Sequence, residues 1–275
     1  MFDHKVLETL NAQAVAAANV RIEHGGSTLA VTPESCRLTN LEPFQLNRDR
    51  FRGQLQTHSL QDFVNYVERH LSGEASLAPA GFIDQDAMSA KVIFNLGTQD
   101  YAGHGDDHAV LTLKPTSAYK ALCEIVGRGL SQQQLAEWLE DWAPHLLASA
   151  NGEALNIVAA INAVRRMTIK ASSQVDTVVG DFNQSRSAMD EIEAKSLDTL
   201  PSQFIFTTRP YEALNPADIT LRLSVITGEK APVLKLRWVG QEAQQEGFAD
   251  EFKQALVAEV GGLVPMTIGT YTQGK

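Results

Sequence analysis

The sequence has few of the residues that mark a disulfide scaffold, a metal cluster or a membrane span. Its 275 residues include two cysteines, Cys36 and Cys123, which lie far apart and in no metal-ligand spacing. Such a pair is typical of free thiols in a reducing compartment. No apolar run reaches the length of a membrane-spanning helix, and the first twenty residues lack the basic segment and apolar core of a signal peptide. We therefore expect a cytoplasmic protein with no membrane partner.

Positive charge is also scarce. Lys and Arg number 23 against 33 Asp and Glu, so the formal net charge is −10. This charge argues against a generic electrostatic grip on nucleic acid or an anionic membrane, but it leaves room for a local basic groove. The chain also lacks GxxxxGK[ST], GxGxxG and a Gly-x-Ser-x-Gly nucleophile elbow. No motif identifies a reaction, and no cofactor is predicted.

What is present is an ordinary globular composition with mixed secondary-structure signals. Hydrophobic residues make up 44% of the chain, which is enough to bury a substantial core. Helical or alternating spacing of the apolar residues, together with Ser N-caps, predicts the elements. The expected helices cover residues 4–19, 59–71, 115–127, 131–146, 152–166, 187–196 and 248–262. The expected strands cover residues 50–56, 90–96, 108–114, 167–182, 203–211, 217–227, 231–239 and 265–272.

These elements are clustered rather than strictly alternating, which favours the α+β class. We expect a mixed, largely antiparallel sheet with a central helical segment and a strand-rich C-terminal region. A change from helix to strand signals near residue 167 suggests two regions, residues 1–166 and 167–275; the alternative is a single domain. Gly228 between two strand signals is typical of a β-hairpin.

The densest cluster of reactive side chains is the stretch QDYAGHGDDHAVLTLK, residues 99–114. Its two histidines are four apart, a spacing that brings both imidazoles to one face of a helix in zinc enzymes. The glycines around the first histidine disfavour a helix, and the alternation that follows predicts a strand. A flexible loop could still bind a divalent metal, but we favour a polar turn whose Asp side chains bond the local backbone. The candidate metal ligands are His104, Asp106, Asp107 and His108.

Basic and aromatic residues around the helix-to-strand change suggest a second kind of site. Basic side chains could contact phosphate groups along a groove, and neighbouring rings could stack on bases. We favour the alternative that the alternating Phe residues face the core. The candidate phosphate contacts are Arg165, Arg166, Lys170, Arg186 and Arg209, and the candidate stacking residues are Phe204, Phe206 and Tyr211.

Several segments resemble those of the YfdQ-like proteins of phages and prophages. They are HSLQDFVNYVERH (58–70), GHGDDHAVLTLKPTSAYKAL (103–122), LSQQQLAEWLED (130–141), GDFNQSRSAMDEIEAKS (180–196), LPSQFIFTTRPYE (200–212) and LKLRWV (234–239). The most distinctive pattern is formed by Ser131, Gln132, Ala136, Glu140 and Asp141. Two features depart from these relatives: a Gly-rich stretch replaces a Trp before the first loop histidine, and Tyr-Glu-Ala replaces Phe-Glu-Gly at 211–213. The resemblance implies a phage or prophage protein in the bacterial cytoplasm, whose relatives often lie near recombination or accessory genes.

These features favour a non-enzymatic phage or prophage accessory protein, a binding or self-assembling module with a link to recombination or host-defence interplay. The alternatives are a metal-dependent hydrolytic enzyme centred on the His104–His108 loop and a nucleic-acid-binding recombination accessory. We also expect a homo-oligomer, because the expected last strand follows two glycines and is free to pair with another copy through residues 263–272. Nucleic acid and a host protein are further candidate partners.

Overall fold

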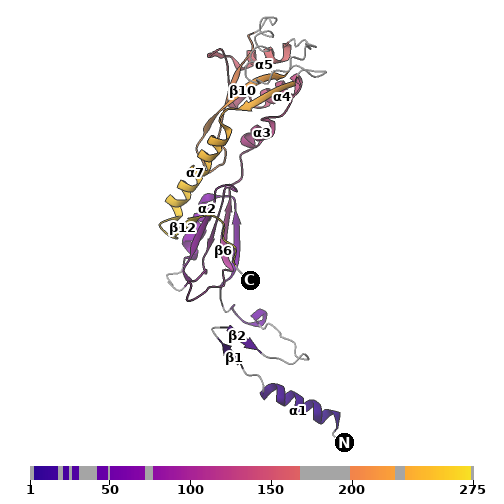
Figure 1. Cartoon of the computed structure of the whole chain (residues 1–275), viewed down its shortest axis with the longest axis vertical. Helices are drawn as coiled ribbons and strands as arrows, with labels where there is room; N and C mark the ends of the chain where they lie inside the picture. The colour runs from indigo at the N-terminus through magenta and orange to yellow at the C-terminus, as the bar shows by residue number, and fades with distance from the viewer. Residues whose placement is uncertain are drawn as a thin grey trace, which may run out of the picture. The chain divides into compact units, whose positions relative to one another are not determined.

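The computed structural model describes residues 3–17, 21–24, 27–30, 42–48, 50–71, 77–167, 199–226 and 233–273 (Figure 1). The chain divides into two compact units, residues 1–51 and 52–275. The described part of the first unit consists of helix α1 (His4–Ala17), the antiparallel pair β1 (Arg21–His24) and β2 (Ser27–Ala30), and the short 3-10 helix η1 (Glu42–Phe44). The second unit contains both larger sheets and all of the candidate site residues that the structure describes.

The first sheet of this second unit is mixed. Its five strands lie in the order β12-β4-β5-β6-β3, with antiparallel pairing in the centre and a parallel strand at each edge. Helix α2 (Leu60–His70) covers one face through buried Phe63, Val64 and Val67. Its start is fixed by Ser59, whose hydroxyl accepts the backbone N–H of Asp62. The strands are β3 (Gly53–Thr57), β4 (Ala80–Asp84), β5 (Ser89–Ile93), β6 (Asp107–Thr112) and β12 (Met266–Ile268).

The second sheet is antiparallel throughout, in the order β11-β10-β9-β7-β8. On its inner face Trp138 of α4 stacks on Phe206 of β9, with ring centroids 5.7 Å apart. The helices of this region are α3 (Ser117–Ile125), α4 (Gln132–Asp141) and α5 (Ile157–Arg166), with the 3-10 helix η3 (Ala143–His145). The strands are β7 (Leu146–Ala150), β8 (Glu153–Leu155), β9 (Gln203–Thr208), β10 (Ala217–Ile226) and β11 (Val233–Trp238).

Helix α7 (Gln241–Val260) connects the two sheets. Near its start, the Gln244 side chain accepts from Trp238 Nε1 and donates to the carbonyl oxygen of Asp218, both on the second sheet. Further along, Asp250 accepts from Gln85 in the turn between β4 and β5 of the first sheet. Buried apolar side chains recur every four residues along the helix and belong to one core that includes residues of both sheets. The second unit is therefore held together through α7.

The α+β class is confirmed, with two largely antiparallel sheets where the sequence suggested one. The β7–β8 hairpin was not expected. Its turn is Asn151-Gly152, both with positive φ, as a two-residue hairpin of the primed type requires. Helix α5 consequently begins at Ile157 rather than near residue 152, and α7 begins at Gln241 rather than near residue 248. Pairing of β7 with β9 joins strands from the two sides of residue 167.

Two of the expected elements, a strand over 167–182 and a helix over 187–196, lie outside the described residues except for Met167. Among the helices that the structure does describe, none combines the length and the apolar character needed to cross a membrane.

The C-terminal tail is paired within its own chain. Strand β12 lies parallel to β4, with Thr267 opposite Phe82. Beyond it, the ring of Tyr271 stacks on Phe82 at a centroid distance of 4.9 Å. Strand β12 is therefore an edge strand of the first sheet that pairs with β4 along one edge, and its contribution to a homo-oligomer stays a prediction.

Candidate functional site

The loop before β6 is organised by one buried amide. Asn95, which is 9% exposed, donates from Nδ2 to Asp106 Oδ1 over 3.0 Å. Its own Oδ1 accepts the backbone N–H of Asp107 over 3.1 Å, and its carbonyl oxygen accepts the N–H of Gly105. The polar-turn hypothesis assigned the bonds to the local backbone to Asp side chains, whereas here the Asn95 side chain bonds the backbone and Asp106 bonds the Asn95 amide.

The four candidate metal ligands do not converge. Asp107 and His108 are consecutive on β6, so their side chains point to opposite faces of the first sheet. His104 is exposed, and one carboxylate oxygen of Asp106 is bound by Asn95. Across the described ranges, no group of three or more His, Cys, Asp or Glu side chains could hold a metal ion. The loop therefore does not supply one ligand set.

Asp107 is the most unusual group in this region. It is 7% exposed, and its Oδ1 is a buried atom with no hydrogen-bond partner among the described residues. Burial raises its pKa above the ordinary value, nearby His70 opposes this, and Asp106 adds to it. Burial, assisted by the Asp107 charge, also raises the pKa of Tyr66, whose ring stacks on His70. The fold thus keeps the carboxyl group of Asp107 in a buried position that disfavours its charged form.

Two glycines let the loop pack closely. A side chain at Gly103 would collide with the carbonyl oxygen of Asn95, which is backbone and cannot turn away. Gly105 has φ +62, and a side chain there would meet Gln273 of the C-terminal tail. The tail therefore crosses from β12 to this loop.

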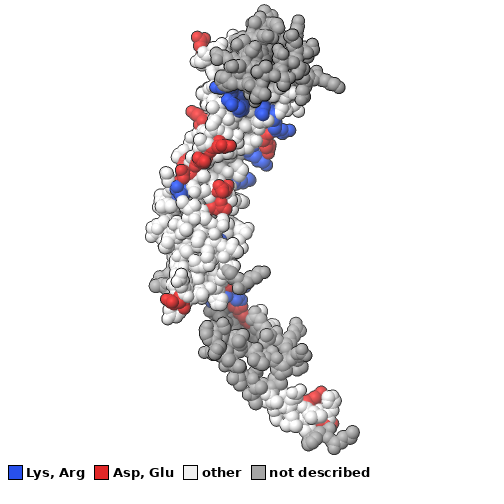
Figure 2. Space-filling model, viewed as in Figure 1, with Lys and Arg blue, Asp and Glu red and all other residues white. Residues whose placement is uncertain are grey.

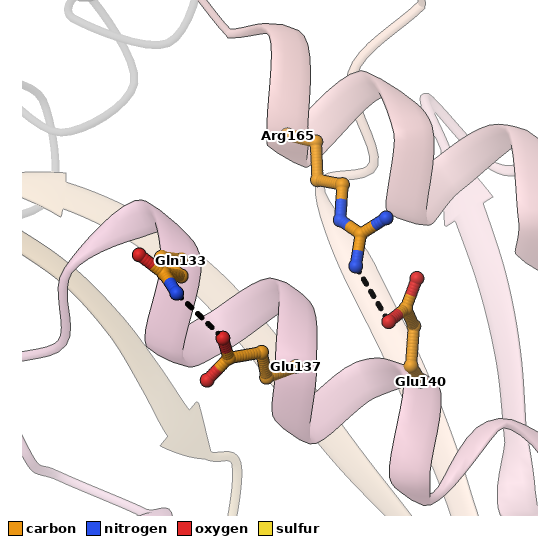
Figure 3. Close-up of polar contacts among 4 residues, drawn as sticks. All are labelled: Gln133, Glu137, Glu140 and Arg165. Carbon is orange, nitrogen blue, oxygen red and sulfur yellow. Dashed lines mark hydrogen bonds and ion pairs between the residues drawn. The ribbon is translucent and has the colours of Figure 1, made fainter.

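The basic candidates divide into separate environments. Arg165 donates to Glu140 Oε2 over 2.6 Å, so its guanidinium bridges α5 to α4 (Figure 3). Arg166 is exposed at the end of α5, and Arg209 is exposed after β9. The remaining two candidates, Lys170 and Arg186, lie outside the described residues.

The pattern that most resembles the YfdQ-like proteins has a structural role. Ser131 caps α4 in a reciprocal capping box with Gln134. The side-chain nitrogen of Gln132 lies 2.6 Å from the carbonyl oxygens of Val164 and Arg165 and 3.2 Å from that of Met167. These carbonyls belong to the C-terminal end of α5, where a helix supplies no N–H partners of its own. Gln132 therefore clamps the end of one helix to the start of another.

The proposed stacking residues do not offer free ring faces on the second sheet. Phe204 and Phe206 are both fully buried, as the core-facing alternative expects. Phe206 is stacked between Trp138 and His145, with centroid distances of 5.7 and 5.4 Å. Tyr211 is half-buried, and its ring contacts that of Tyr119 with the centroids 5.7 Å apart. The structure does not support a base-stacking role for the two phenylalanines.

A cationic patch on the outer face of the second sheet was missed by sequence reasoning. Strands β10 and β11 alternate, with buried residues inward and polar residues outward. Arg222 lies directly opposite Arg237, and Ser224 lies opposite Lys235. We call Arg222, Lys235 and Arg237 the cationic patch. In Figure 2, Lys and Arg side chains lie over the region of the second sheet and α3 with some acidic side chains among them, whereas most side chains coloured over α7 are Asp and Glu.

Little negative charge accompanies this patch. Asp218 is the only acidic residue among the outward-facing positions of the five strands, and its Oδ1 accepts from Thr207 Oγ1 over 2.6 Å. Like charges directly opposite each other in a sheet are destabilising. The strand register thus sets Arg222 opposite Arg237 in a chain whose net charge is −10. The alternation of Lys and Arg in LKLRW was the available sequence signal.

No curated protein and no solved structure matches this chain. A family model matches residues 4–271, which is nearly its whole length. The chain belongs to the family described as "Uncharacterized conserved protein (DUF2303)".

Proposed function

We propose that this protein is a non-enzymatic binding module that engages nucleic acid on the outer face of its second sheet. The observation that carries the proposal is the cationic patch. It places positive side chains from two paired strands side by side, with Arg237 exposed and Lys235 half-buried. Phosphate oxygens are the groups that Arg and Lys bind most readily in nucleic acids.

The polar side chains beside the patch support the same function. Gln203 lies next to Arg222 across β9 and β10, and Ser149 lies next to Gln203 across β7 and β9. An amide and a hydroxyl are both donors and acceptors, so they can bond phosphate, sugar or a base edge. Gln203 and Ser149 therefore extend the polar surface from the cationic patch across β9 and β7.

Net charge limits the strength of this binding but does not forbid it. The net charge of −10 repels a polyanion at long range, whereas the patch acts at contact distance within about one Debye length, roughly 8 Å at physiological salt. We therefore expect modest affinity that falls steeply as salt rises.

The resemblance to YfdQ-like proteins supports a proposal for the biological setting. We place the protein among phage or prophage accessory proteins of the bacterial cytoplasm, with a role linked to recombination or host-defence interplay. We also retain a homo-oligomer as the working assembly, since several modest sites on one particle bind a long strand through avidity.

A metal-dependent hydrolytic enzyme is the second candidate, and one observation favours it. The Oδ1 atom of Asp107 is a buried carboxylate oxygen with no hydrogen-bond partner among the described residues. Asp107 also lies close enough to His70 for the charge of His70 to lower the Asp107 pKa, against the effect of burial. Elemental analysis of protein purified without chelator tests this alternative. About one Zn or Mn per chain that is lost on Asp107→Asn would favour the enzyme, and we expect no such stoichiometric metal.

The binding proposal is tested by fluorescence anisotropy with a labelled oligonucleotide of about 20 nucleotides. The test variant is Lys235→Glu/Arg237→Glu. The matched control is Lys114→Glu/Lys120→Glu, which changes the net charge equally at two exposed positions away from the patch. We expect the test variant alone to lose about 25-fold in affinity near 0.1 M salt, with its salt slope reduced by about 1.4.

Equal losses in the two variants would contradict the proposal, because the effect would then come from net charge. Unchanged binding in the test variant would contradict it as well. Circular dichroism of both variants checks that the second sheet is still folded.

A further inference from the structure

The outer face of the second sheet carries a second row of side chains beside the cationic patch. Across the strands, Leu147 is paired with Ile205 and Ile205 with Thr220. The backbone N–H of Val239 bonds the carbonyl oxygen of Thr220, which extends the row past the end of β11. We call Leu147, Ile205 and Val239 the apolar row.

This row is open to solvent. Leu147 is 65% exposed and Val239 is 38% exposed, while Ile205 between them is half-buried. Large apolar side chains on a sheet face are usually turned inward, as they are at Phe204 and Phe206 on the opposite side of the same strands. The exposed apolar side chains therefore form a surface that an apolar ligand face can cover.

The two rows run parallel to each other across the sheet. Thr220 and Arg222 are two residues apart on β10, so the apolar row and the row through Arg222 are separated by about 7 Å. A nucleotide has a similar arrangement, with a charged phosphate on one side and on the other a base whose flat ring faces are much less polar than its edges. Phosphates over the cationic patch would bring bases over the apolar row.

From this pairing of rows we infer that the protein binds single-stranded rather than duplex nucleic acid, with bases lying on the apolar row. The inference rests on the proposed function and names its substrate class. In a duplex the base faces are stacked on one another, so only their edges are accessible in the grooves. The apolar row therefore has no exposed base face to contact in a duplex.

The width of the sheet leads to the same conclusion. Five strands spaced about 4.8 Å apart span roughly 19 Å. The major groove of B-form DNA is about 12 Å wide, which admits a helix or a two-stranded ribbon but not this sheet. A duplex could therefore contact the cationic patch only through phosphates, whereas a single strand can use both rows.

The test compares single-stranded and duplex oligonucleotides of the same sequence on the full chain, again by anisotropy. The test variant is Leu147→Ser/Val239→Ser, and Lys235→Glu/Arg237→Glu is measured beside it. The matched control is Val257→Ser/Leu263→Ser, which removes two similarly exposed apolar side chains on and after α7.

We expect the wild-type chain to prefer the single strand by at least tenfold. We expect Leu147→Ser/Val239→Ser to lose about five- to tenfold in single-strand affinity with no change in salt slope, because it removes no charge. The control should bind as the wild type does.

Each contrary result has a distinct meaning. Equal wild-type affinity for duplex and single strand, or a serine variant that binds the single strand normally, would overturn the inference while the cationic patch could still stand. If Lys235→Glu/Arg237→Glu instead binds both the single strand and the duplex as tightly as the wild type does, the proposed function itself is overturned.

Discussion

The Gln132 clamp makes a sharp prediction about stability. The side-chain amide of Gln132, in the first turn of α4, donates to the carbonyl oxygens of Val164 and Arg165 at the end of α5 over 2.6 Å. The substitution Gln132→Glu keeps the shape of the side chain but replaces the donor with a carboxylate. The new charge faces carbonyl groups and the negative end of a helix dipole.

The expected loss can be worked out from these contacts. An amide nitrogen has two N–H groups, so two hydrogen bonds are lost at about 0.5–1.5 kcal/mol each. The new charge is unfavourable at the C-terminus of α5 by about 0.3–1 kcal/mol and favourable in the first turn of α4 by a similar amount, so the two dipole effects roughly cancel. Allowing for the carbonyls left unsatisfied, we expect Gln132→Glu to lower the free energy of unfolding by about 2–4 kcal/mol.

Urea unfolding followed by circular dichroism measures this loss, and Gln133→Glu is the matched control. The neighbouring Gln133 is exposed, and its amide bonds only Glu137 over 2.7 Å on the same helix (Figure 3). The control makes the same charge change but should cost only about 0.5 kcal/mol. If the two variants unfold at the same urea concentration, the clamp does not hold α4 to α5.

Three further predictions concern other parts of the second unit and the assembly. Asp107→Asn should raise the free energy of unfolding at pH 7 by about 1–2 kcal/mol, because it removes a buried charge that lacks a hydrogen-bond partner. The Asp107 carboxyl binds a proton more tightly in the folded wild type than in the unfolded chain, so the stability of the wild type rises as pH falls from the raised folded pKa towards the ordinary value of 3.8. The stability advantage of Asp107→Asn should therefore shrink over that window. An equal advantage at pH 7 and pH 4 would be inconsistent with this cause. Gly103→Ala should lower the free energy of unfolding by about 2–4 kcal/mol, because the new Cβ would collide with the Asn95 carbonyl oxygen. Gly247→Ala, in an open position on α7, should raise it by about 0.5–1 kcal/mol. Thermal unfolding distinguishes the two variants. Light scattering on a size-exclusion column should give a mass above that of the 30.0 kDa chain; a clean monomer at micromolar concentration would remove the homo-oligomer from the account.

Local signals in the sequence were sufficient for several elements. Ser59 and Ser131 mark the starts of α2 and α4 because a cap depends on residues only three positions away. The antiparallel pairing of β10 with β11 follows from two alternating segments that are close together in the sequence. The β7–β8 hairpin was missed because its Ala-rich strands have helical propensity, although Asn151-Gly152 was a usable turn signal.

Features that depend on distant partners could not be predicted in this way. Gln132 gains its role from carbonyl groups more than thirty residues away, and nothing near it in sequence identifies them. Asp107 and His108 form a plausible ligand pair on paper, but the pleat of β6 separates them. The cationic patch and the apolar row exist only because strand register brings together residues from four separate strands and the end of β11.

Cross-linking locates the surface through which the protein binds a single strand. A photo-reactive oligonucleotide is cross-linked to the full chain, and the modified peptides are identified by mass spectrometry. The account predicts cross-links in peptides that contain Leu147, Ile205 or residues 233–239, and their loss in Leu147→Ser/Val239→Ser. Cross-links that map instead to α7 or to residues 1–51, and that persist in this variant, would contradict the assignment of nucleic-acid binding to the outer face of the second sheet.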